Sequence, residues 1–115
     1  MPTTTSSDRG AVVLLPFPFS DLSGAKLRPA VIVSPQYPSD DLLVVALTSV
    51  GDVLRPGEFP IRSWRQAGLL HPSFAKRALA SVSGDLVRTS LGHLQRDDMA
   101  RLDDALQLWL GVGTA

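Results

Sequence analysis

The stretch Lys26-Leu27-Arg28-Pro29-Ala30-Val31-Ile32-Val33-Ser34 places a cation and a proline directly before a short apolar run. Pro29 cannot continue a helix, and it favours extended geometry for the residue before it, Arg28. The branched side chains that follow are typical of a strand. Arg28 is therefore expected where a loop enters a buried strand, which is a good way to fix a guanidinium. A surface arginine at a strand start is the simpler alternative.

Short apolar runs separated by proline and glycine continue on both sides of this stretch. Gly68 is expected to close a single helical turn over residues 63–67. Phe17 and Phe19, in a proline-interrupted segment, are expected to cover one end of the fold. Strands are predicted at residues 11–15, 28–34 and 42–48, a short strand at 58–61, and two short strands or one bent strand over 73–82.

The clearest helix lies towards the end of the chain. Asp97 and Asp98 fall in its first turn, where the helix dipole favours anions, and Gly111 is the stop signal. Leu108 points to the polar side. The apolar residues that share one helical arc are Met99, Leu102, Ala105, Leu106, Trp109 and Leu110.

Several short strands followed by one helix predict a mostly β fold, a small antiparallel barrel with a covering C-terminal helix. At 115 residues the chain is expected to form one domain, at residues 10–112, after a disordered lead at residues 1–9. The first three strands are apolar on both faces, whereas one face of a small antiparallel sheet normally meets water. The terminal helix, a second subunit or both must cover the outer face, and we expect a homodimer.

Composition excludes several classes of protein. There are no cysteines, so neither a disulfide framework nor a thiolate metal site is expected. His71 and His93 have no further ligand at metal-binding spacing, so no metal or cofactor is expected, and both are interpreted as structural. No apolar run approaches the ~20 residues of a membrane span, and no signal peptide is evident, so the chain is expected to be cytoplasmic.

Charge is balanced overall but unevenly distributed. The net charge of zero argues against strong non-specific binding to nucleic acid. Between residues 53 and 88, however, six cations face two anions, and residues 97–104 hold four aspartates and one arginine. This pattern fits either a local positive surface or ordinary solvated charge.

The chemistry-bearing residues nearest to the opening stretch are Thr48 and Ser49, at the end of the next strand. If these two strands form a hairpin, the start of one lies beside the end of the other. Arg28 then lies next to the two hydroxyls. A guanidinium with an adjacent hydroxyl is a natural clamp for an oxyanion or a phosphate. No Ser/His/Asp arrangement, glycine-rich phosphate loop or carboxylate pair competes with this assignment.

Four blocks of sequence carry a resemblance to a known family: GAVVLLPFPFSD (10–21), KLRPAVIVS (26–34), ALTS (46–49) and WRQAGLLHPS (64–73). Together with LGHL (91–94) before the acidic start of the helix, their combination and order resemble the PemK/MazF family of toxin–antitoxin ribonucleases. The block at 26–34 is the most specific.

This resemblance implies an SH3-like barrel, a homodimer, and a growth-inhibiting toxin that cleaves single-stranded RNA, including mRNA, without a metal. It also implies an acidic antitoxin partner, DNA binding together with that antitoxin, and the RNA's own 2′-hydroxyl as nucleophile. Arg28 falls on the family's proposed proton donor or phosphate stabiliser. Thr48 falls on the residue that holds the scissile phosphate, with Ser49 as a second hydroxyl.

Two departures from the family pattern concern the general base. Some members carry an acid on the strand at residues 73–83, where this chain has only Lys76 and Arg77. If a carboxylate base is needed, it must come from elsewhere in the chain, and Asp21, in the loop before Arg28, is a candidate for this role. The first loop also lacks an early acidic pair, so base preference is expected to differ.

Four further side chains are predicted to bind RNA. Lys26, Lys76 and Arg77 would contact phosphates, although they also fit ordinary solvated charges. Trp64 would stack on a base or, alternatively, anchor the core. Two other functions stay open: a non-catalytic toxin of the same fold that poisons gyrase, and a degenerate, inactive toxin that acts as a regulatory partner. Because gyrase poisoning does not need Arg28 and Thr48 together, their joint presence favours cleavage.

Overall fold

The computed structural model describes residues 8–16, 26–35, 40–51 and 53–113. Phe17, Phe19 and Asp21 lie outside these residues. Residues 1–7 of the predicted lead, and residues 36–39 before the third strand, also lie outside them. The elements are β1 (Ala11–Pro16), β2 (Leu27–Ile32), β3 (Asp41–Thr48), β4 (Phe59–Pro60), β5 (Phe74–Ser83), the 3-10 turn η1 (Gly84–Leu86), β6 (Thr89–His93) and α1 (Arg96–Leu110).

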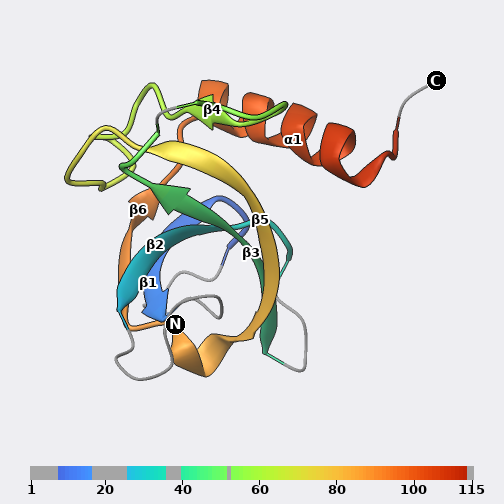
Figure 1. Cartoon of the computed structure of the whole chain (residues 1–115). Coiled ribbons are helices and arrows are strands. Elements are labelled where there is room, and N and C mark those ends of the chain that lie inside the picture. Colours follow the sequence, from blue (N-terminus) through green and yellow to red (C-terminus); the bar gives the residue numbers. More distant parts are fainter. Residues whose placement is uncertain (1–7, 17–25, 36–39, 52, 114–115) are drawn as a thin grey trace.

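All six strands in the described residues belong to one antiparallel sheet, in the order β4-β5-β3-β2-β1-β6. The sheet curls, with the long strand β5 arching around the others, and α1 lies across one end (Figure 1). The prediction of a mostly β, barrel-like fold with one C-terminal helix is therefore confirmed.

Strands β1 to β3 bury side chains on both faces. One hydrophobic cluster holds Val12, Val31 and Val45 and extends to Leu102 and Ala105 of α1. The other cluster takes the alternate residues of the same strands and is closed by β5, η1 and the segment after it. Both faces are thus covered within one chain, so their apolar character does not by itself require a second copy. The homodimer stays a prediction.

β5 is the single bent strand that the sequence allowed. Its register against β3 shifts, because Val45 faces Leu79 whereas Leu47 faces Ala75. β5 therefore has extra residues around Arg77, and a bulge of this kind bends a strand and frees backbone groups from the ladder. The predicted short strand before it is reduced to Phe59–Pro60.

β6 is a strand that the sequence analysis did not predict. Thr89–His93 shows no buried alternate residues, and it is held by antiparallel pairing with β1. The beginning of the folded region also differs from the prediction. Arg9, expected in a disordered lead, donates from Nε to Val33 O at 2.9 Å and forms an ion pair with Asp103.

Helix α1 has Asp97 and Asp98 in its first turn and ends at the predicted stop signal. Gly111 adopts a left-handed conformation with φ of 69° and donates to Gln107 O at 2.9 Å, which ends the helix. Leu108 is exposed as expected, but Leu110, placed on the buried arc, is also exposed. In the described part of the chain, no helix is long and apolar enough to cross a membrane.

Candidate active site

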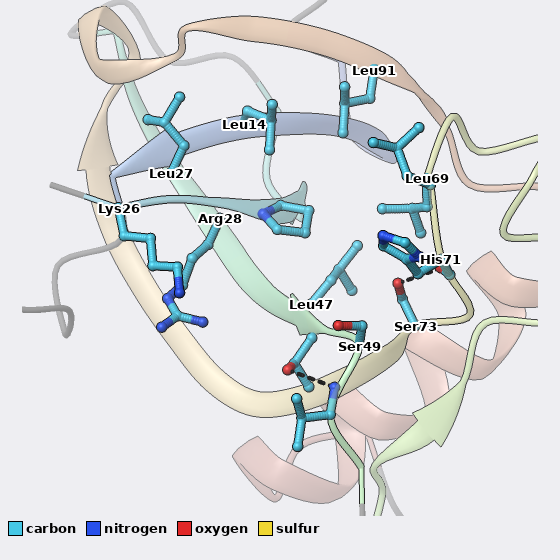
Figure 2. A pocket seen from close by; sticks show the side chains of 14 residues that line it. Leu14, Lys26, Leu27, Arg28, Leu47, Ser49, Leu69, His71, Ser73 and Leu91 are labelled. Carbon is cyan, nitrogen blue, oxygen red and sulfur yellow. Dashed lines mark hydrogen bonds between the residues drawn. The ribbon is translucent and has the colours of Figure 1, made fainter.

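A pocket of about 330 Å³ opens where β2 begins and β3 ends (Figure 2). Its described lining comes from five parts of the chain, namely β1, the start of β2, the end of β3, the segment after Gly68, and β6. The lining residues are Leu14, Lys26, Leu27, Arg28, Pro29, Leu47, Thr48, Ser49, Val50, Leu69, Leu70, His71, Ser73 and Leu91.

The pocket combines apolar walls with a polar rim. Leucines and a proline make up half of its lining residues, and its surface is mainly apolar, which suits the flat face of an aromatic ring better than a fully hydrated ion. Lys26 and Arg28 reach towards one side of it, while His71, Ser49 and Ser73 lie on the other (Figure 2). A planar apolar group and an anion attached to it can therefore be bound together.

Arg28 and Thr48 line the same pocket from neighbouring strands. β2 pairs with β3 from Ala30–Ala46 to Ile32–Val44, and Arg28 comes just before this paired stretch of β2 as Thr48 comes just after that of β3. The start of β2 and the end of β3 therefore lie at the same end of the strand pair. On its other side, Arg28 pairs with Leu15 of β1. The backbone that carries the guanidinium and the backbone that carries the hydroxyl are thus held by neighbouring strands.

The Thr48 hydroxyl is oriented by the backbone. Its Oγ1 accepts a hydrogen bond from Val50 N at 3.1 Å, which occupies one lone pair and leaves the O–H free to donate. Ser49, the next residue, is exposed on the rim. Two hydroxyl donors therefore border the space into which a phosphate oxygen would enter.

The electrostatic character of the rim is positive. Within the described part of the chain, Lys26 and Arg28 are exposed and have no hydrogen bond or ion pair, and no acidic residue lines the pocket. The described residues also contain no cluster of three or more His, Cys, Asp and Glu that could hold a metal ion. Two free cations beside two hydroxyls form an anion-binding rim.

The segment after Gly68 forms the far wall. The predicted single turn is present, with Ala67 N donating to Ser63 O at 3.1 Å and Leu69 N to Trp64 O at 3.0 Å. Gly68 has φ of +87° and lies directly against the backbone of Leu91, where a side chain would collide. This close packing fixes the direction in which the chain enters the pocket wall.

Asp98 holds that turn in place from α1. It is fully buried and accepts from Arg62 N at 3.0 Å and Ser63 N at 2.9 Å, as well as from Arg101. Burial alone would raise the pKa of Asp98, but these hydrogen bonds and the Arg101 charge outweigh it and lower the pKa below its usual value. Asp98 does lie in the first turn of the helix, as predicted. It is also buried, and it joins α1 to the turn at residues 62–63, which the sequence did not predict.

Glu58 plays a similar part for the bulge of β5. Its buried carboxylate accepts from Arg55 N at 2.8 Å, Arg77 N at 3.0 Å and Lys76 Nζ at 3.3 Å. Burial raises the pKa of Glu58, whereas the hydrogen bonds from Arg77, Arg55 and Lys76 and the Lys76 charge lower it, with a net decrease. Lys76 is therefore committed to an internal ion pair, which the sequence did not reveal.

The other predicted RNA contacts lie outside this pocket. Trp64 is partly buried and packs against the hydrophobic cluster under α1, with the Arg65 guanidinium 4.7 Å from its ring centroid, as the anchoring alternative expects. Neither Lys76 nor Arg77 lines the pocket. Conversely, His71, interpreted as structural, is exposed and lines it.

A curled antiparallel sheet with one covering C-terminal helix and a cationic pocket defines a class of small β-sheet proteins to which known toxins belong. The family model described as "PemK-like, MazF-like toxin of type II toxin-antitoxin system" matches residues 8–110. The chain belongs to this family. Among the curated proteins, none matches.

Solved structures of similar fold cover nearly the whole chain. An endoribonuclease in complex with its cognate antitoxin, from a Mycobacterial species, has a TM-score of 0.74 at 22% identity, over 94% of this chain and 98% of that one. MazF from Deinococcus radiodurans has 0.73 at 22% identity, over 91% and 96%. The Mycobacterium tuberculosis toxin MazF-mt6 has 0.70 at 16% identity, over 90% and 99%. These likenesses agree with the fold described above.

Proposed function

We propose that this protein is an endoribonuclease toxin that cleaves single-stranded RNA without a metal ion. The observation that carries the proposal is that the unpartnered Arg28 side chain and the Thr48 hydroxyl line the same, largely apolar pocket, from the start of β2 and the end of β3. Family membership and the solved relatives described as endoribonucleases support the same function. A single-stranded substrate fits, because its unstacked bases can enter a pocket.

In this proposal the pocket's parts have separate roles. The leucine walls receive one base, and Lys26 neutralises the backbone near it. Arg28 spans two oxygens of the scissile phosphate with its planar fork, and Thr48 and Ser49 donate hydrogen bonds to the same group. The 2′-hydroxyl attacks the adjacent phosphorus, and the 5′-oxygen leaves. The products are a 2′,3′-cyclic phosphate and a free 5′-hydroxyl, and Arg28 stabilises the charge that develops on phosphorus.

The proposal includes two protein partners. A symmetric dimer would bury on the order of 1,500 Å², and light scattering at micromolar concentration should give twice the mass of one chain. An acidic antitoxin would occupy the pocket, since carboxylates can replace phosphates on the cationic rim and apolar side chains can fill the leucine walls. One of the similar structures is described as a complex with its cognate antitoxin, and two others are described as MazE-MazF. The proposed place of action is the cytoplasm, where mRNA is found.

The test is an RNA cleavage assay in excess EDTA with a long unstructured RNA as substrate. Purified protein should cut it and leave cyclic phosphate ends, whereas protein carrying Arg28→Ala, purified in the same way, should not. A strict requirement for added magnesium would contradict the mechanism. RNA binding without cleavage would favour the degenerate toxin instead.

The antitoxin is tested by competition. A labelled, fully 2′-O-methylated RNA binds without being cut, because its nucleophile is blocked. The acidic product of the neighbouring gene should release this RNA. Measured without RNA, binding of that product should weaken with salt but not vanish, because part of the contact is apolar. A stable ternary complex would rule out occlusion of the pocket.

A further inference from the structure

His71 occupies a junction between two hollows of the surface. It lines the pocket already described and, with Ser49, Gly51, Pro72 and Phe74, a second and more open hollow. Ser49 and His71 are the residues that both hollows share among those described. A chain of nucleotides with one base in each hollow would pass its connecting sugar and phosphate over this junction.

The backbone around His71 is held firmly although its side chain is exposed. Leu69, two residues before it, is buried, and Pro72 restricts the conformation of His71 itself. Its carbonyl accepts from Ser73 Oγ at 2.8 Å, and Ser73 O in turn accepts from Ile61 N at 2.8 Å. The imidazole is thus presented to the pocket from a fixed position.

Cleavage by the 2′-hydroxyl needs a group that accepts its proton. Of the described residues that line the pocket, Lys26 and Arg28 are cations and the rest, apart from His71, are apolar or hydroxyl side chains. Imidazole is the side chain that exchanges a proton between pH 5 and 8. In the described structure the ring of His71 has no hydrogen-bond partner. The second histidine differs, because both ring nitrogens of His93 lie near carbonyl oxygens, at 2.8 and 3.0 Å.

We propose that His71 is the general base of the cleavage reaction, a role that rests on the proposed ribonuclease function. Its imidazole accepts the proton of the 2′-hydroxyl as the bond from O2′ to phosphorus forms. The bond from phosphorus to O5′ breaks, and the leaving oxygen takes a proton from water at the open mouth. Arg28 and Thr48 hold the phosphate meanwhile. The charged groups that share the pocket with His71 in the described residues are Lys26 and Arg28, both from the start of β2.

The test compares His71→Gln with His93→Gln in single-turnover cleavage between pH 5 and 8. The wild-type rate should rise with pH, and His71→Gln should be about 100-fold slower or more, with the rise lost. His93→Gln should keep the wild-type rate and profile. Free imidazole should partly restore His71→Ala, which a merely structural role would not allow. Thermal unfolding of each variant checks that its fold is intact.

A modified substrate distinguishes two possible roles of His71, namely a general base that accepts the 2′-hydroxyl proton and a general acid that protonates the leaving group. Sulfur in place of the 5′-oxygen leaves without needing a proton. The deficit of His71→Gln should therefore persist on this 5′-phosphorothiolate RNA, and its disappearance would overturn the assignment as base. A His71→Gln rate within threefold of wild type would overturn the proposal as a whole. In either case, cleavage by the wild-type protein would still support the ribonuclease function, whereas a wild-type protein that does not cleave RNA would contradict that function itself.

Discussion

Charged side chains are used in opposite ways on the two sides of the molecule. Near α1, both carboxylate oxygens of Glu58 and of Asp98 accept hydrogen bonds in buried positions. At the pocket, Lys26 and Arg28 are exposed and, within the described residues, have no such partner. Buried, paired charges are costly to disrupt, whereas unpaired surface cations contribute little to folding and are free for a ligand. Stability and activity should therefore respond to different substitutions.

The largest effect on stability is expected from Asp98→Ala. Two backbone N–H groups and Arg101 would lose their buried partner, which should lower the free energy of unfolding by about 3–5 kcal/mol. Urea denaturation followed by tryptophan fluorescence measures this. The matched control is Asp97→Ala on the exposed side of the same turn, with an expected loss below about 1 kcal/mol. Equal losses for the two variants would contradict the anchor.

Arg28→Ala should show the reverse behaviour. Cleavage should fall by about 100-fold or more, because the phosphate loses its main charged donor. The free energy of unfolding should change by less than about 0.5 kcal/mol, since the side chain is exposed. Arg28→Lys should also fail, because lysine lacks the two-pronged geometry. Arg96→Ala, an exposed arginine at the start of α1, is the control, and full activity of Arg28→Ala would refute the site.

Thr48→Ala should have an intermediate effect on cleavage. Loss of one hydroxyl contact to the phosphate corresponds to roughly 1–3 kcal/mol, or about 5- to 150-fold in kcat/KM. Thr89→Ala, on the exposed strand β6, is the matched control and should be silent. If the two threonine variants cleave equally well, the hydroxyl is not part of the clamp.

Acid should lower the free energy of unfolding by protonating the buried carboxylates of Asp98 and Glu58. The pKa values of Asp98 and Glu58 are lowered in the folded protein, so their stabilisation is complete above the unfolded values of about 4 and is lost as pH falls below them. Urea midpoints should therefore change little between pH 7 and about pH 5 and decline from there to pH 3. Glu58→Gln should make that decline shallower, because one of the two carboxylates no longer titrates. An unchanged slope would mean that Glu58 does not contribute.

The smallest effect is expected from Arg77→Ala. If this exposed side chain contacts RNA outside the pocket, it contributes one phosphate contact, and its loss should weaken binding less than about tenfold. The slope of log affinity against log salt should fall by about one. Binding of 2′-O-methylated RNA at several salt concentrations measures both. Arg77 is a cleaner test than Lys76, which is ion-paired to Glu58. An unaltered salt slope would mean that Arg77 does not contact an RNA phosphate.

Local sequence patterns were sufficient to predict most elements of the fold and, in the pocket, the proximity of Arg28 and Thr48. The strands around Val31 and Val45, the turn at Gly68 and the stop at Gly111 each follow from neighbouring residues, and the structure has them. The proximity of Arg28 and Thr48 also followed from sequence, because consecutive strands that form a hairpin bring those ends together.

The features that were missed all depend on contacts between distant segments. β6 exists because it pairs with β1, about 80 residues earlier, and its own residues show no strand pattern. Asp98 bonds to residues 35 and 36 positions away, which no periodicity in α1 reveals. His71 reaches the pocket only because β5 pairs with β3, which brings the segment before Phe74 beside Thr48.

The position of α1 in the chain has a consequence for synthesis of the protein. The helix is translated after every strand that it covers, and it supplies both apolar side chains to the cluster and the carboxylate that fixes the turn at residues 62–63. The wall that carries His71 follows this turn directly. Until the helix has left the ribosome, that wall lacks the anchor that Asp98 supplies. A nascent chain would therefore acquire its complete pocket only when the helix emerges, after the mRNA that encodes the strands has been read.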